Sequence, residues 1–210
     1  MLNRTIPSTI MLAALMTATG CHASSKADTP FMLNEAALPK NFPKPGPIGQ
    51  VVTKTYPAHR YAKTVSPEDD TGRSKMFRSL FRHIKKNSIA MTSPVNMEYG
   101  PRVGGNKEPM QPVSMAFYYA SQDIGETGDD DGISVRDMPG QTVLSVGVRG
   151  SYSNANFAKG LALILAFMNE HADDYRPIGN PRYLGYNSPF VPDFMKYGEV
   201  QIPVTKGSSG

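Results

Sequence analysis

The chain has 210 residues, of which 40% are hydrophobic, so it can bury the core of one domain or at most two small ones. Its 22 basic and 18 acidic residues give a formal net charge of +4, a bias too mild to indicate a nucleic-acid partner. The single cysteine, Cys21, excludes an intramolecular disulfide and a metal site built from several cysteines.

The first residues, 1–20, are predicted to be a signal peptide rather than part of the fold. Arg4 precedes an apolar run that ends at Met16, which is too short to cross a bilayer but typical of a secretory signal. The small residues before Cys21 resemble the lipobox of bacterial lipoproteins. This predicts lipidation of Cys21, a membrane anchor, and a position in the bacterial cell envelope facing the periplasm or the exterior. An ordinary signal peptide cleaved near Ala23 is the alternative.

Residues 21–47 combine the anchor with a proline-rich stretch, which favours an extended tether. The domain is expected over 48–205, and the residues from 206 to 210 are expected to form a disordered tail. Alternating residues predict two strands, over 51–55 and 59–65, with the sequence Tyr-Pro-Ala between them.

An amphipathic helix is predicted over 75–87, because apolar residues recur there at helical spacing. The apolar stripe comprises Met76, Phe77, Leu80, Phe81 and Ile84. The opposite, basic face comprises Lys75, Arg78, Arg82, Lys85 and Lys86, and His83 lies on the border. Such a helix usually buries its stripe against a sheet and leaves its basic face in water.

A two-faced strand is predicted over 89–99. Its odd positions, from Ile89 to Tyr99, are almost all apolar, whereas its even positions are small or polar. Pro94 has no N–H to donate to a neighbouring strand, which predicts an edge strand or a bulge. The glycine-rich loop that follows, within 100–112, does not open a helix, so a phosphate-binding loop is not expected.

A further strand is predicted over 113–120. The same order of elements then returns, with strands predicted over 133–137 and 142–150, a helix over 153–171, and strands over 183–186 and 199–204. The acidic stretch 125–132 lacks the spacing of an EF-hand and is interpreted as a solvated turn. The predicted fold class is α+β: a distorted antiparallel β-barrel of about eight strands, built from two β-β-α-β-β-like halves with two main helices.

Five stretches, in one order along the chain, resemble the SOUL family of haem-binding proteins. They lie at 51–58, at 77–84, at 89–95 with the letters Ile-Ala-Met-Thr-Ser-Pro-Val, at 143–149, and at 184–190 with the letters Leu-Gly-Tyr-Asn-Ser-Pro-Phe. The resemblance covers 48–204 and implies a distorted barrel similar to the effector-binding domains of some bacterial regulators. It also implies a haem or related tetrapyrrole ligand. Of the basic residues that the family often has before its closing strand, this chain keeps Lys196.

No nucleophile elbow, Walker loop or HExxH motif occurs, so the chain is not expected to be an enzyme. A tetrapyrrole needs an apolar slot and cations for its propionates, and the helix over 75–87 offers both. The candidate haem-binding residues are Met76, Leu80, His83, Ile84, His59, Arg78 and Arg82. His83 or His59 is a possible axial ligand, whereas His171 is interpreted as capping a helix end.

Three hypotheses follow from the sequence. The first is a membrane-tethered haem or porphyrin binder without catalysis. The second is an effector or small-ligand module of the same fold with a non-haem ligand, and the third is a structural envelope lipoprotein without a small ligand. A visible absorption spectrum with and without added hemin separates the first hypothesis from the other two.

Overall fold

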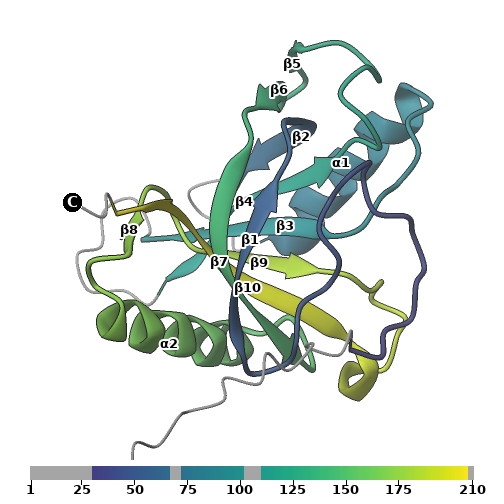
Figure 1. The fold of residues 1–210 in the computed structure, drawn as a ribbon. Helices are drawn as coiled ribbons and strands as arrows, with labels where there is room; N and C mark the ends of the chain where they lie inside the picture. The colour runs from purple at the N-terminus through teal and green to yellow at the C-terminus, as the bar shows by residue number, and fades with distance from the viewer. Residues whose placement is uncertain (1–29, 67–71, 102–109, 208–210) are drawn as a thin grey trace, which may run out of the picture.

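The computed structural model describes residues 30–66, 72–101 and 110–207, which form one sheet and two α-helices (Figure 1). The predicted signal peptide, Cys21 and residues 208–210 lie outside the described residues. None of the helices in the described ranges is long and apolar enough to cross a membrane. In chain order the elements are β1 (Val51–Tyr56), β2 (His59–Val65), α1 (Arg73–Lys86), β3 (Val95–Gly100), β4 (Gln111–Tyr118), β5 (Gly128–Asp130), β6 (Ile133–Met138), β7 (Gln141–Arg149), α2 (Asn154–Glu170), β8 (Tyr175–Pro177), β9 (Arg182–Gly185), the 3-10 helix η1 (Asp193–Met195) and β10 (Tyr197–Lys206).

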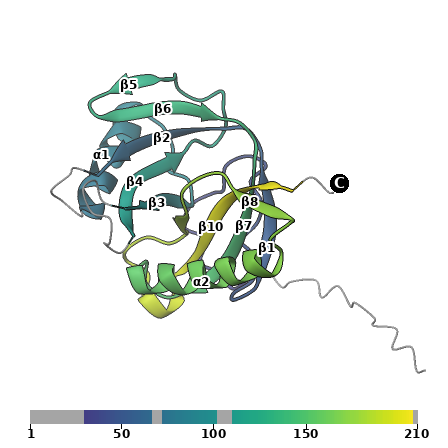
Figure 2. The same ribbon diagram turned by 90° about the vertical axis from the view of Figure 1, so that its left-hand side faces the viewer.

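The sheet is open. Within the described ranges it holds ten antiparallel strands in the order β1-β7-β10-β9-β3-β4-β2-β6-β5, with β8 beside β10. Strands β1 and β5 form its two ends and do not pair, so the predicted closure into a barrel is wrong. Because β5 has three residues, all exposed, it offers too little edge to close a ring of hydrogen bonds. Figure 2 shows the strands turning from β5 at one end of the sheet to β1 at the other.

The predicted repeat is confirmed as a pattern of elements. Strands β1 and β2, helix α1 and strands β3 and β4 form one half, and β6, β7, α2, β9 and β10 form the other. The helices predicted over 75–87 and 153–171 match α1 and α2 to within two residues at each end. The sheet has ten strands instead of about eight because β5 and β8, with three residues each, are too short to leave an alternating pattern.

Both helices cover the same face of the sheet. Helix α1 packs on β4 and β2, and α2 packs on β7 and β10. A Cβ atom on Gly160 of α2 would lie 2.5 Å from the Val200 side chain of β10, so α2 can approach the sheet this closely only at a glycine. The helix side chains buried in this core are Met76, Leu80, Ile84, Phe157 and Ile164.

Strand β3 lies in the middle of the sheet, between β9 and β4. Of the two alternatives predicted for 89–99, the edge strand is therefore wrong, and the register shift that β3 shows against β4 lies between Glu98 and Tyr99 instead of at Pro94. The basis of the prediction, the missing N–H of Pro94, does not apply because the ladder begins one residue later, at Val95. The predicted alternation is confirmed, with one pair of side chains on the helix-covered face (Met97, Tyr99) and another on the opposite face (Asn96, Glu98).

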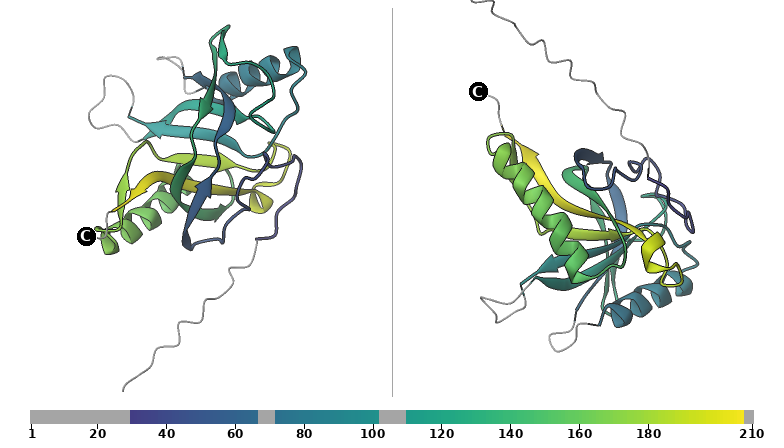
Figure 3. Two further views of the ribbon diagram at one scale, coloured as in Figure 1. Left: turned by 45° about the horizontal axis from the view of Figure 1, so that its top comes forward. Right: turned by 90° about the horizontal axis from the view of Figure 1, so that it is seen from below.

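The opposite face is partly covered by residues 30–49, which we call the N-terminal strap (Figure 3). Phe42 of the strap is buried among tyrosine rings of the sheet. The N–H of Gly147 in β7 donates to the carbonyl of Pro47 at 3.0 Å. A Cβ atom on Gly147 would lie 2.6 Å from that oxygen, so the approach requires glycine. The tether expected over 21–47 thus contacts the domain along its described part.

A buried ion pair joins the strap to the sheet. The Glu199 carboxylate of β10 is fully buried and accepts hydrogen bonds from the Lys54 ammonium of β1 and the Gly46 N–H of the strap. Burial lowers the pKa of Lys54, and the charge of Glu199 opposes that shift. Three more donors complete the shell of Glu199: the hydroxyls of Tyr197 at 2.9 Å and Tyr186 at 3.2 Å, and the amide of Gln201 at 3.0 Å.

Candidate functional site

Two large cavities lie on opposite faces of the sheet. The cavity on the helix-covered face has a volume of about 540 Å³ and is lined mainly by apolar side chains, and we call it the apolar cavity. This volume suits a drug-sized molecule or a cofactor. The apolar side chains of its lining come from α1, β3, β4, the segment before α2 and the loop after β9: Phe77, Val95, Met97, Met115, Tyr152 and Pro189.

The sheet and α1 supply two apolar walls. Met97 of β3 and Met115 of β4 are register partners on neighbouring strands, and both side chains are buried. Phe77 of α1 meets the ring of Phe117 edge to face, with ring centroids 5.1 Å apart. Thioethers and aromatic rings are polarizable, so these walls would pack well against a flat conjugated ligand.

A hydrogen-bonded chain places the remaining wall. Arg73, at the start of α1, donates to the backbone carbonyl of Tyr152. The Tyr152 hydroxyl donates to the carbonyl of Tyr197 at 3.0 Å and accepts from the N–H of Asn187 at 2.7 Å. These bonds connect α1 to the loop between β9 and β10, which carries Pro189 against the cavity.

Two further cations lie beside the apolar cavity. Arg78 of α1 is exposed, and its Nε donates to the backbone carbonyl of Ser74 at 3.2 Å. No carboxylate within the described residues pairs with Arg78. Lys196 forms an ion pair with the exposed Asp193 at 2.7 Å. An anionic group of a ligand would therefore find donors at the rim of an apolar cavity.

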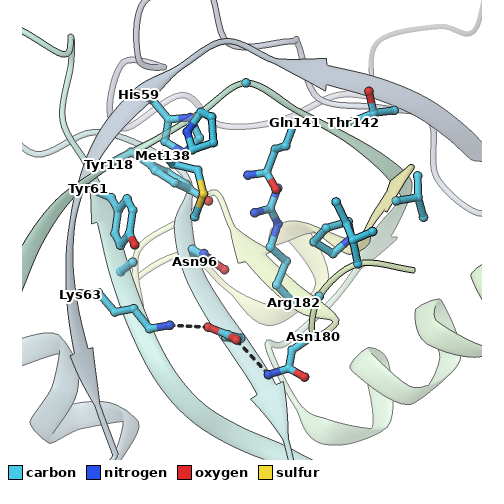
Figure 4. Close-up of a pocket in the computed structure, with 18 of the residues that line it drawn as sticks. His59, Tyr61, Lys63, Asn96, Tyr118, Met138, Gln141, Thr142, Asn180 and Arg182 are labelled. Carbon is cyan, nitrogen blue, oxygen red and sulfur yellow. Dashed lines mark hydrogen bonds and ion pairs between the residues drawn. The ribbon is translucent and has the colours of Figure 1, made fainter. Parts of the chain in front are cut away.

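The second cavity, on the other face, has a volume of about 650 Å³ and is shown in Figure 4. We call it the polar cavity, because charged and amide side chains lie among its walls: His59, Lys63, Asn96, Glu98, Gln141 and Arg182. The lining of the apolar cavity contains fewer charged and amide side chains, so its apolar surface is less interrupted. The apolar cavity is therefore the better candidate for a flat, largely hydrophobic ligand.

The structure separates the predicted haem-binding residues. Met76, Leu80 and Ile84 are buried between α1 and the sheet and line neither large cavity. Arg78 lines the apolar cavity. Arg82 contacts a hollow of about 30 Å³ beside the β5–β6 hairpin, which is too small for a macrocycle.

Neither predicted axial ligand lines the apolar cavity. His83 is a buried residue of α1, and its Nε2 atom lies 2.9 Å from the Tyr119 hydroxyl. His59 lines the polar cavity, and its Nδ1 donates to the carbonyl of Pro57 at 2.8 Å. The described lining of the apolar cavity contains no histidine, although it contains the thioethers of Met97 and Met115.

The two buried histidines predict a pH dependence of stability. Burial lowers the pKa of His59 and of His83, so the folded protein binds these protons more weakly than the unfolded chain does. Stability is therefore expected to fall as the pH drops through about 6.5, the ordinary histidine pKa. Urea unfolding at about pH 7.5 and about pH 5.5 measures this change, and the double variant H59Q/H83Q should show a smaller one. Stability that rises on acidification over this range contradicts the prediction.

Comparison with known proteins assigns the family. The family model described as "SOUL heme-binding protein" matches residues 49–203, which is most of the chain. The chain belongs to the SOUL heme-binding family. No curated protein sequence matches this SOUL protein.

Solved structures similar to this SOUL protein share its α+β fold. The C-terminal domain of EcmrR aligns with a TM-score of 0.57 at 15% identity, over 75% of this chain and 98% of that domain. A hydrolase encoded by lin2189 from Listeria innocua aligns with a TM-score of 0.53 at 11% identity, over 76% of this chain and 93% of that one. Identities this low show the fold alone.

Several residues of the candidate site in this SOUL protein do not follow from the sequence pattern. Phe77 fits the apolar stripe of α1, yet it is half-buried and lines the cavity. One signal is present in the sequence, because Arg73 and Phe77 lie four residues apart and therefore on one side of α1. Tyr152 and Pro189 carry no such signal, since only the folded chain brings their loops to α1.

Proposed function

We propose that this SOUL protein binds haem or a related tetrapyrrole in the apolar cavity and does not catalyse a reaction. The observation that carries the proposal is an apolar cavity of about 540 Å³ with Arg78 at its rim, whose guanidinium pairs with no carboxylate among the described residues. Membership of a family named for heme binding supports the same ligand.

The residues of the apolar cavity fit the chemistry of a haem. Phe77, Met97 and Met115 offer apolar surface for the macrocycle, and Arg78 and Lys196 offer charged donors for its propionates. A bound haem would supply a redox-active iron, while these side chains bind and orient it. Because no described lining residue is a histidine, enclosure and propionate contacts are the means of binding that we propose.

A hemin titration with a cavity-filling variant tests the proposal. Ser74 is exposed on α1 and lines the apolar cavity, so S74W would fill the cavity without entering the core. We expect purified protein to bind hemin saturably, with a shift of the Soret band, and S74W to bind at least about tenfold more weakly. The matched control is A158W, at an exposed position on α2 outside both cavities, which should bind as the parent does.

Two outcomes of the titration would contradict the proposal. If no saturable hemin binding occurs at micromolar protein, haem is not the ligand. If S74W binds hemin as tightly as the parent, the ligand does not bind in the apolar cavity. If H59A loses hemin binding while S74W keeps it, the haem binds in the polar cavity instead, because His59 lines that cavity.

We further propose that the protein is attached to the bacterial cell envelope through lipidated Cys21, facing the periplasm or the exterior. The support is the sequence of residues 1–21, with its short apolar run and the small residues before the cysteine. The mass of the mature protein tests this proposal. A mature chain that begins at Cys21 and carries acyl groups is expected, and C21A should lack them.

A further inference from the structure

The polar cavity contains a buried cation that has no anionic partner in the part of the chain that the structure describes. Arg182 of β9 is only 6% exposed, and its Nε donates to the Gln201 side-chain oxygen at 3.0 Å. Its guanidinium carbon lies 5.5 Å from the ring centroid of Tyr56. Among the described residues, no carboxylate lies within ion-pair distance of Arg182. Buried arginines are normally paired, so this one has capacity for an external anion.

The other charges of the polar cavity leave it cationic. The lining includes Lys63, Arg182 and Lys206 as cations and Glu98 as the carboxylate. Glu98 accepts a hydrogen bond from Lys63 at 2.6 Å, so these two charges neutralise each other. Burial lowers the pKa of His59 and so disfavours a positive charge on that imidazole. The positive charges of Arg182 and Lys206 therefore remain, and the cavity favours an anion over a cation.

Two neutral polar atoms in the same cavity also lack partners. The Nε2 atom of Gln141 and the Oδ1 atom of Asn96 are buried and have no hydrogen-bond partner within the described ranges. Figure 4 shows these two side chains and Arg182 extending into one cavity from different strands. Buried polar atoms without partners are costly, and one donor with one acceptor suits a hydroxyl group, which can both accept and donate.

We propose that the polar cavity binds a small organic acid, whose carboxylate pairs with the guanidinium of Arg182 and whose hydroxyl contacts Gln141 and Asn96. Arginine matches a carboxylate because its planar guanidinium can donate two parallel hydrogen bonds. Tyr61 and Tyr118 line the same cavity and would pack against a flat apolar body of the ligand. This binding is independent of the haem proposed for the other face of the sheet.

The test uses 4-hydroxybenzoate as the probe and 4-hydroxybenzamide as its uncharged control. Titration of the full purified chain, followed by two-dimensional amide NMR, should show saturable shifts around the polar cavity with the acid and much weaker ones with the amide. R182Q should weaken binding of the acid at least about tenfold, because the charged contact is lost. R176Q is the matched control, since Arg176 is exposed and lines neither large cavity.

Because Arg182 is buried, a second variant accompanies R182Q. Q141L removes the Gln141 Nε2 atom, which has no partner among the described residues, at a half-buried position and should weaken binding of the acid while leaving the fold intact. The proposal is overturned if no saturable shifts occur at about 10 mM probe, a limit that corresponds to very weak affinity. It is overturned as well if the amide binds like the acid, or if Q141L and every folded Arg182 variant bind like the parent. Hemin binding by Q141L should equal that of the parent, so this proposal and the haem proposal can fail separately.

Discussion

Reversing the charges of Arg78 and Lys196 together is expected to weaken hemin binding about 100-fold, with about tenfold for each lost charge-assisted contact. Both residues line the apolar cavity, and neither contributes to the core. The change should appear mainly in the dissociation rate, because each contact forms only in the bound state. Soret titration of R78E/K196E against the parent measures the affinity, and stopped-flow competition with apomyoglobin measures the dissociation rate.

A matched double variant separates this contact from general attraction between charges. R82E/K85E makes the same change of net charge, with both substitutions on α1 at positions outside the apolar cavity. R82E/K85E should weaken hemin binding much less than R78E/K196E does. The affinity that R82E/K85E loses relative to the parent should become smaller in high salt, because salt screens attraction between distant charges. If both double variants lose the same affinity, the propionates do not contact Arg78 and Lys196, and the proposed orientation is wrong.

Replacing Lys54 with methionine is expected to cost about 3–5 kcal/mol of folding free energy, because it leaves the Glu199 carboxylate buried without its cation. The Lys54 side chain is 7% exposed and that of Glu199 is 0% exposed, so water cannot replace the lost partner. The remaining donors around Glu199 are neutral. Urea unfolding of K54M and the parent gives the difference in free energy.

Two controls sharpen the stability measurement. K44M makes the same substitution at an exposed strap residue and should change the free energy of unfolding by less than about 0.5 kcal/mol. The double variant K54M/E199Q removes the second charge and should recover part of the loss, since a neutral amide is cheaper to bury. A K54M protein as stable as the parent would mean that Glu199 is hydrated or protonated in the folded state.

The sequence pattern predicts the helices and most strands, because their periodicity is local. It does not predict that the sheet stays open, since the pairing of strand ends depends on contacts between segments far apart in the chain. The many prolines in 30–47 predict an extended tether. In the structure, however, the ring of Phe42 is buried and the N–H of Gly46 donates to the Glu199 carboxylate. Single residues of this kind leave no periodic signal, so the strap could not be predicted from its composition.

The candidate site is less predictable than the fold. Arg78 follows from the basic face of α1, and the structure places it at the apolar cavity. Met76 and Leu80 follow from the stripe of α1, but a stripe marks the core and not a ligand surface. The cavity forms where α1 meets the segments carrying Tyr152 and Pro189, a junction that exists only in the folded chain.

The most direct test of haem binding in the apolar cavity is a map of where a porphyrin contacts the protein. Gallium protoporphyrin is diamagnetic, so amide NMR of the labelled protein can report shifts close to the ligand. We expect the largest shifts at α1 from Arg73 to Arg78, at Tyr152 and in the loop that carries Pro189. Shifts that gather instead around His59 and Arg182, with none on α1, would place the ligand in the polar cavity and contradict the account.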